Sequence, residues 1–180
     1  MLYSMDTSKL IPKSMQQEQL QYLKKIIVQY TQDMAGIAKA FAATYGVSNQ
    51  TEATDYDFSW LEEWHYNYAQ EQYDLQEMNL TFEDYDRPIV YQNKLWDLHV
   101  HDPHWLFTSD NSIKIEVYYS DIRRIDTCFL LDYANSLENN ILGSLKLNFN
   151  NTVALLDQLV QEKYLQKLPC HHSGFVYILQ

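Results

Sequence analysis

The chain has 180 residues with four glycines, two cysteines and a formal net charge of −11 at pH 7. This length suffices to bury the core of one domain without a structural metal or disulfide bonds. No phosphate-binding pattern of the G-x-G-x-x-G or G-x-x-x-x-G-K-S/T type occurs. The scarce cysteines, the lack of a basic-then-apolar signal region and the lack of a long apolar run predict a cytoplasmic protein that does not cross a membrane.

We expect residues 1–13 to form a loose leader ahead of the first helix. From Leu20 to Phe41, apolar residues recur at alternating spacings of three and four, which is an unbroken a/d stripe. The stripe predicts a long helix over residues 15–45, and Gly46 stands where a C-cap glycine belongs. Two interpretations stay open, because the stripe can pack on its own domain or serve as a homodimer seam.

The next segment, residues 51–86, carries the whole charge imbalance. It holds eleven acidic residues and no Lys or Arg, whereas the rest of the chain is neutral. Ser59-Trp60-Leu61-Glu62 reads as a capping box, which predicts a helix to about Glu77. The segment is also rich in aromatic residues. The negative electrostatic field of these eleven acids repels nucleic acid and attracts a basic protein surface. The expected partner contacts on it are Glu62, Glu63, Tyr66, Glu71, Asp74 and Asp84.

After Pro88 the pattern changes to short β-prone runs at residues 89–91, 95–101, 105–108 and 113–119. Turn-forming residues separate the last two runs, so a hairpin joins them and the four runs predict an antiparallel meander.

Two further helices and a terminal strand are predicted in the last third of the chain. Asp126 can cap a helix to about Glu138, and Asn150 or Asn151 can cap the next. The run from Gly174 to Leu179 predicts a strand. The expected core residues of the two helices are Phe129, Leu130, Tyr133, Val153, Leu155, Leu156, Leu159 and Val160. The order of elements predicts an α+β fold in a single domain over residues 14–180.

The stretch DLHVHDPH, residues 97–104, raises the question of a metal site. On a strand, His99 and His101 lie on the same face because side chains alternate, and His104 can turn back toward them. Three histidines can hold a zinc ion that keeps an open position for water. DLHVH also resembles the opening metal motif of amidohydrolases and histidinol-phosphatase-like phosphoesterases, which implies a large barrel with later ligands. Only His171 and His172 follow, so we expect the histidines to lie on a solvated face without a cofactor.

The C-terminal segments VALLDQLVQEKYLQKL and GFVYIL resemble the last helix and hairpin of a winged-helix domain. A DNA-binding protein would need basic residues on the preceding helix, but residues 125–162 contain a single Lys or Arg, which is Lys146. Cys170 beside His171 raises the question of a nucleophile pair, for which a structural turn is the expected interpretation. No complete catalytic constellation is present, so we do not expect an enzyme.

The stretch LHVHDPHWLFTSDNSIKIEVYYSDIRRIDTCFLLDYANS, residues 98–136, resembles a bacterial family of small domains counted among the immunity proteins of polymorphic toxin systems. His99 corresponds to the histidine of the family's F-H-G-x-G-C strand, and Arg124-Ile125-Asp126 to its R-I-D. Val100 and Thr127 replace glycines of the family pattern. The resemblance implies a binding protein and carries no functional residue.

The leading hypothesis is therefore a cytoplasmic immunity-type protein that binds and neutralises a basic toxin or effector domain. One alternative is a small metal-dependent hydrolase that holds zinc through His99, His101 and His104. Another is a structural scaffold subunit that dimerises through the stripe from Leu20 to Phe41.

Overall fold

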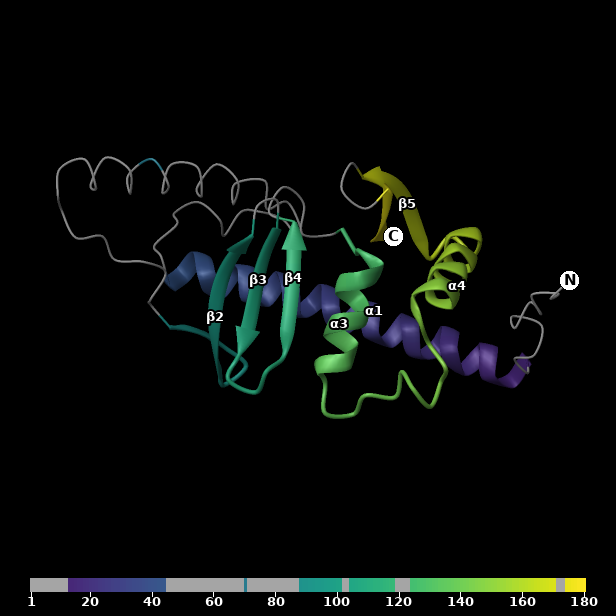
Figure 1. The fold of residues 1–180 in the computed structure, drawn as a ribbon. Coiled ribbons are helices and arrows are strands. Elements are labelled where there is room, and N and C mark those ends of the chain that lie inside the picture. The colour runs from purple at the N-terminus through teal and green to yellow at the C-terminus, as the bar shows by residue number, and fades with distance from the viewer. Residues whose placement is uncertain (1–12, 45–69, 71–87, 102–103, 119–123, 171–173) are drawn as a thin grey trace, which may run out of the picture. The chain divides into compact units, whose positions relative to one another are not determined.

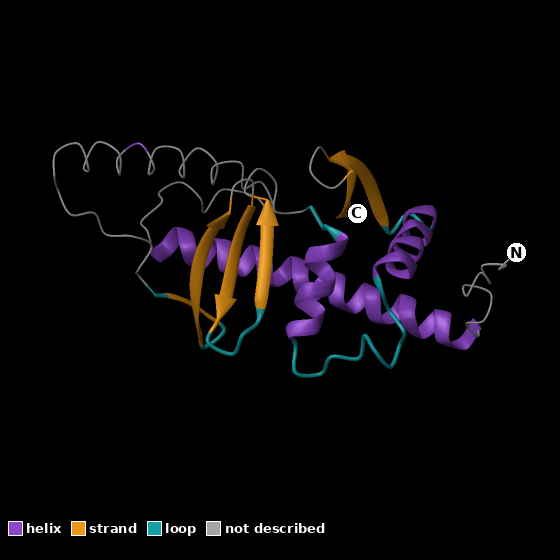
Figure 2. Ribbon diagram, viewed as in Figure 1, coloured by secondary structure: helices purple, strands orange, loops and turns teal. Residues whose placement is uncertain are grey.

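The computed structural model describes residues 13–44, 70, 88–101, 104–118, 124–170 and 174–180. Their helices and strands confirm the α+β fold class (Figures 1 and 2). The chain forms two compact units, one of Met1–Gln29 with Ile125–Gln180 and one of Tyr30–Arg124. The leader and the helix predicted from Ser59 to Glu77 lie outside the described residues, apart from Gln70 and Lys13. The elements are α1 (Lys13–Thr44), β1 (Ile89–Tyr91), β2 (Lys94–His101), β3 (His104–Ser109), β4 (Lys114–Tyr118), α3 (Thr127–Ser136), α4 (Phe149–Gln161), β5 (Leu165–Cys170) and β6 (Gly174–Leu179).

The unit Tyr30–Arg124 contains a four-stranded antiparallel sheet in the order β1-β2-β3-β4, so the predicted meander is confirmed. Gln92 and Asn93 close the first hairpin with φ angles of 51° and 58°. Two consecutive positive φ angles are typical of a type I′ turn, whose twist matches that of the strands. The last hairpin turns through Ser112, which has a φ of 65°.

One face of this sheet packs against the C-terminal half of α1 (Figure 1). The ring of Phe41 meets that of Trp105 edge to face at 5.2 Å between centroids. Phe107 lies 6.3 Å from Phe41 in a similar arrangement. Each such fully buried aromatic side chain stabilises the fold by roughly 1.5–3 kcal/mol through the hydrophobic effect. The aromatic contacts therefore fix the inner face of the sheet on the helix.

The apolar stripe of α1 is buried within one chain. Its members from both units are 0–1% exposed, so packing on the chain itself explains the three-four spacing. These buried members are Leu23, Ile27, Tyr30, Met34, Ile37 and Phe41.

In the unit of Met1–Gln29 with Ile125–Gln180, helix α3 begins after Asp126, as predicted. Asp126 is the N-cap of α3, and its Oδ1 accepts hydrogen bonds from the backbone N–H groups of Cys128 and Phe129 at 2.8 and 3.3 Å. Leu130 and Tyr133 are fully buried, but Phe129 is only half-buried, which corrects one core prediction.

The N-cap of α4 was predicted wrongly at Asn150 or Asn151. Asn148 is the cap, and it exchanges hydrogen bonds with Asn151 in a capping box. The three asparagines at positions 148, 150 and 151 made the cap position ambiguous in the sequence, and the cap lies three residues before Asn151. Val153 and Val160 are half-buried rather than core residues, whereas Leu155, Leu156 and Leu159 are buried as predicted.

The predicted terminal strand is β6, and it forms an antiparallel hairpin with β5. The fold prediction missed β5, because Pro169 interrupts a run that lacks the apolar alternation of a half-buried strand. Ile125 forms an isolated bridge to Tyr177 on the other edge of β6. The order of elements in this unit is therefore α3, α4 and the hairpin of β5 and β6.

Candidate functional site

The six expected partner contacts lie outside the described residues. They are Glu62, Glu63, Tyr66, Glu71, Asp74 and Asp84. His171 and His172 lie outside them as well, so the Cys170 pair is not described. Neither Cys128, which is exposed, nor Cys170, which is buried, is in a disulfide bond.

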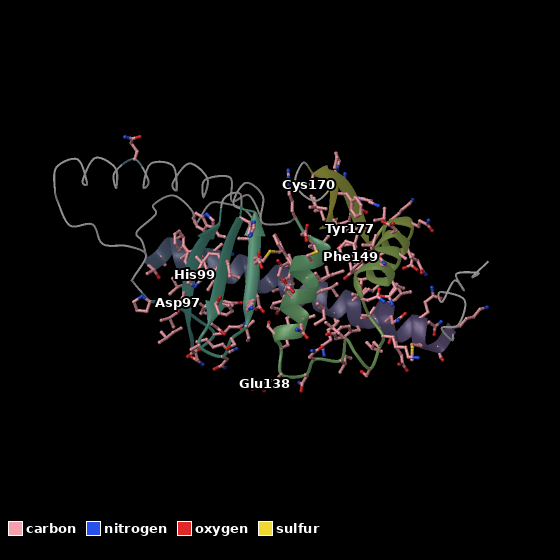
Figure 3. The ribbon with its side chains drawn as sticks, in the orientation of Figure 1. Asp97, His99, Glu138, Phe149, Cys170 and Tyr177 are labelled. Carbon is pink, nitrogen blue, oxygen red and sulfur yellow. The ribbon has the colours of Figure 1, made fainter. Side chains whose placement is uncertain are left out.

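The histidine stretch lies on β2 and β3 of the sheet. Asp97 and His99 are exposed, whereas the alternating Trp96 and Leu98 are buried, as strand geometry requires (Figure 3). In the register of the two strands, the Cα atom of His101 is paired with that of His104. The predicted solvated position of His99 is therefore confirmed, and the strand register brings the backbones of the other two histidines together.

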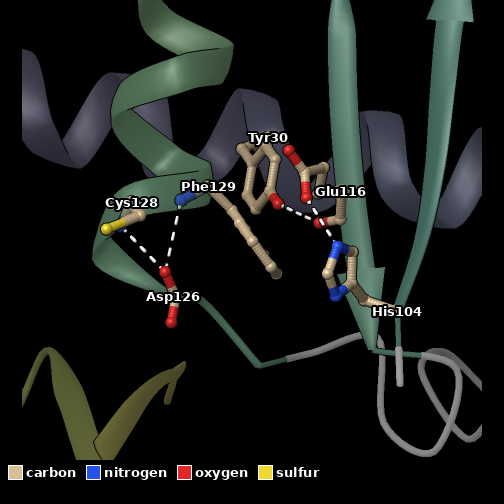
Figure 4. A network of polar contacts seen from close by, with 6 residues as sticks. All are labelled: Tyr30, His104, Glu116, Asp126, Cys128 and Phe129. Carbon is tan, nitrogen blue, oxygen red and sulfur yellow. Dashed lines mark hydrogen bonds and ion pairs between the residues drawn. The ribbon is translucent and has the colours of Figure 1, made fainter. Parts of the chain in front are cut away.

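His104 forms an ion pair with a carboxylate on the neighbouring strand. Its Nε2 lies 3.0 Å from Oε2 of Glu116 on β4, and the two side chains are 26% and 18% exposed (Figure 4). The hydroxyl of Tyr30 donates a hydrogen bond to the backbone carbonyl of Glu116. Among the described residues, no three His, Cys, Asp or Glu side chains form a group that can hold a metal ion.

Tyr30 also covers an edge of the sheet. β4 is the last strand in the sheet order, so its outward carbonyls have no neighbouring strand among the described residues. A tyrosine hydroxyl that satisfies one of them blocks the pairing of another chain at this edge. The opposite edge strand, β1, carries Val90, whose side chain is 59% exposed.

The helix start at Asp126 accounts for the motif that carried the family resemblance. Ile125 is fully buried and pairs with Tyr177, while Asp126 caps α3. Both residues therefore stabilise a strand-to-helix junction. No ligand contact is needed to explain this part of the pattern.

A polar cluster joins α4 to the C-terminal hairpin. Asp157 accepts hydrogen bonds from the Tyr177 hydroxyl at 2.8 Å and from Nζ of Lys167 at 2.9 Å. The same Nζ lies 3.9 Å from the centroid of the Phe175 ring. Burial and the hydrogen bond to Asp157 raise the pKa of Tyr177. These contacts link Asp157 of α4 to side chains of both hairpin strands, so the cluster stabilises the packing of the hairpin on the helix.

The surface of α4 does not have the chemistry of a DNA-recognition helix. Its sequence, FNNTVALLDQLVQ, contains no Lys or Arg. Binding of nucleic acid depends on such cations to neutralise phosphates. The winged-helix-like order of elements therefore carries no indication of nucleic-acid binding.

The described residues thus define an α+β protein with a four-stranded meander and a helix-helix-hairpin unit. Within them, no helix combines the length and apolar character needed to span a membrane. No family model, curated protein or solved structure matches this chain.

Proposed function

We propose that the chain is a cytoplasmic immunity-type protein that binds and neutralises a basic toxin or effector domain. The observation that carries the proposal is the segregation of charge along the chain. Eleven acids and no Lys or Arg fall within residues 51–86, and the acids and the Lys and Arg residues outside this segment are equal in number. A field of one sign on one segment speeds association with a surface of the opposite sign.

The charges of the described residues support this assignment, because several of them are paired within the fold. Lys167 binds Asp157 at 2.9 Å, and Lys24 lies 3.9 Å from Glu162. Exposed ion pairs of this kind contribute at most about 1 kcal/mol each, but they cancel the local field. Acids and bases outside residues 51–86 balance in number, so the net negative charge of the chain is that of this segment.

The aromatic residues of the same segment supply the second part of the proposal. Tyrosine and tryptophan side chains dominate binding energy at protein interfaces once they are desolvated, while the surrounding acids set the association rate and its salt dependence. Tyr66 is the aromatic contact among the six proposed partner residues, and it falls between Glu63 and Glu71 in the sequence.

The test is a comparison of two charge reversals of equal size. The variant Glu62→Lys, Glu63→Lys, Asp74→Lys removes acids of the segment. The control Asp110→Lys, Asp132→Lys, Glu138→Lys changes the net charge equally at exposed positions elsewhere. Each tagged protein is incubated with lysate of its source at low salt, and bound proteins are identified by mass spectrometry.

We expect the wild type and the control to retain one basic protein that moderate salt elutes, and the segment variant to lose it. The retained protein, produced on its own, should be toxic or enzymatically active, and the wild type should suppress that activity at equimolar concentration. Equal loss in both charge-reversal variants would attribute binding to net charge alone and would contradict the proposal, as would retention of no protein by the wild type.

A further inference from the structure

We draw no further inference here: the strongest candidate, the exposed apolar pair that Val90 of β1 and Leu95 of β2 form on the outward face of the sheet, carries nothing, because acidic and basic residues flank it alike in the sequence and nothing in the structure shows what covers it.

Discussion

The phenol ring of Tyr91 lies against the backbone of Gly36 in α1. A Cβ atom at residue 36 would come within 2.2 Å of Cε2 and 2.5 Å of the hydroxyl oxygen of Tyr91. One turn earlier on the helix, Oδ1 of Asp33 accepts a hydrogen bond from that hydroxyl at 3.2 Å. A glycine within a helix costs roughly 1 kcal/mol relative to alanine. Its presence here is explained by the space that the edge strand β1 requires.

We predict that Gly36→Ala destabilises the protein by about 1–3 kcal/mol, despite the better helix propensity of alanine. The new methyl group must displace the Tyr91 ring and with it the hydrogen bond to Asp33. In a Tyr91→Val background the ring is absent, so the same substitution should be neutral or stabilising by up to about 1 kcal/mol. Urea unfolding of the four proteins in this double-mutant cycle measures the coupling. Additive effects would show that the ring does not determine the glycine.

The second prediction concerns alkaline pH. Burial, followed by the charge of Asp33 and the hydrogen bond to it, raises the pKa of Tyr91 to about 12. Since the ordinary value is 10, the folded state holds the neutral phenol more strongly than the unfolded state does. The resulting stability is fully present below pH 10 and is lost as the pH rises from 10 toward 12.

Urea midpoints at pH 9 and at pH 11.5 check this prediction. The drop between the two pH values should be smaller in Tyr91→Phe, which has no phenol to ionise at that position. It should also be smaller in Asp33→Asn, because the carboxylate charge no longer opposes ionisation of Tyr91. An identical drop in wild type and both variants would assign the alkaline loss to other tyrosines, of which Tyr177 also has a raised pKa.

Much of the fold could be predicted from local patterns. The stripe in α1 has the period of a helix and is buried as expected, and the strand at Gly174–Leu179 was predicted with its observed bounds. Asp126 could be predicted as a cap, because aspartate is among the preferred N-cap residues and stands here directly before an apolar helical run. The helix, the strand and the cap are each determined by residues close together in the sequence, so a local sequence pattern is enough to predict them.

The errors arose where the determining contact is distant in sequence. β5 is specified by its pairing with β6 rather than by its own pattern, and Pro169 obscures it. The proximity of Gly36 and Tyr91 joins residues far apart in the chain, so nothing near Gly36 indicates it. For the site, the alternation around His99 predicted its exposure, but the pairing of His104 with Glu116 depends on the register of β3 and β4. Two consecutive apolar residues in β1, Ile89 and Val90, could have indicated that one of them is exposed, because neighbouring side chains on a strand point to opposite faces.

The third prediction tests the junction that contains the resemblance motif. Asp126→Ala leaves the N–H groups of Cys128 and Phe129 without their acceptor and should cost about 1–2 kcal/mol of stability. Asp126→Asn should retain most of it, because asparagine caps helices nearly as well. Asp132→Ala, at an exposed position inside α3, serves as the control and should change stability by less than about 0.5 kcal/mol. Thermal unfolding of the three variants makes the comparison. An equal loss at both aspartates would contradict the capping role.

The last prediction separates the two hydrogen bonds that converge on Asp157. Tyr177 is fully buried, so loss of its hydroxyl in Tyr177→Phe removes a hydrogen bond to a charged acceptor, worth about 1.5–3 kcal/mol. The side chains of Lys167 and Asp157 are 35% and 41% exposed, so Lys167→Met breaks a solvent-screened ion pair worth about 1 kcal/mol or less.

Contact between Nζ of Lys167 and the Phe175 ring adds about 0.5–1 kcal/mol at such an exposed site, and the methionine side chain recovers part of it by packing on the ring. We therefore expect Tyr177→Phe to lower the free energy of unfolding more than Lys167→Met at low salt, and 0.5 M NaCl to widen the difference because it already weakens the ion pair in the wild type. Urea unfolding at both salt concentrations decides the order. A larger loss for Lys167→Met would mean that the lysine, rather than the tyrosine, holds the hairpin to α4.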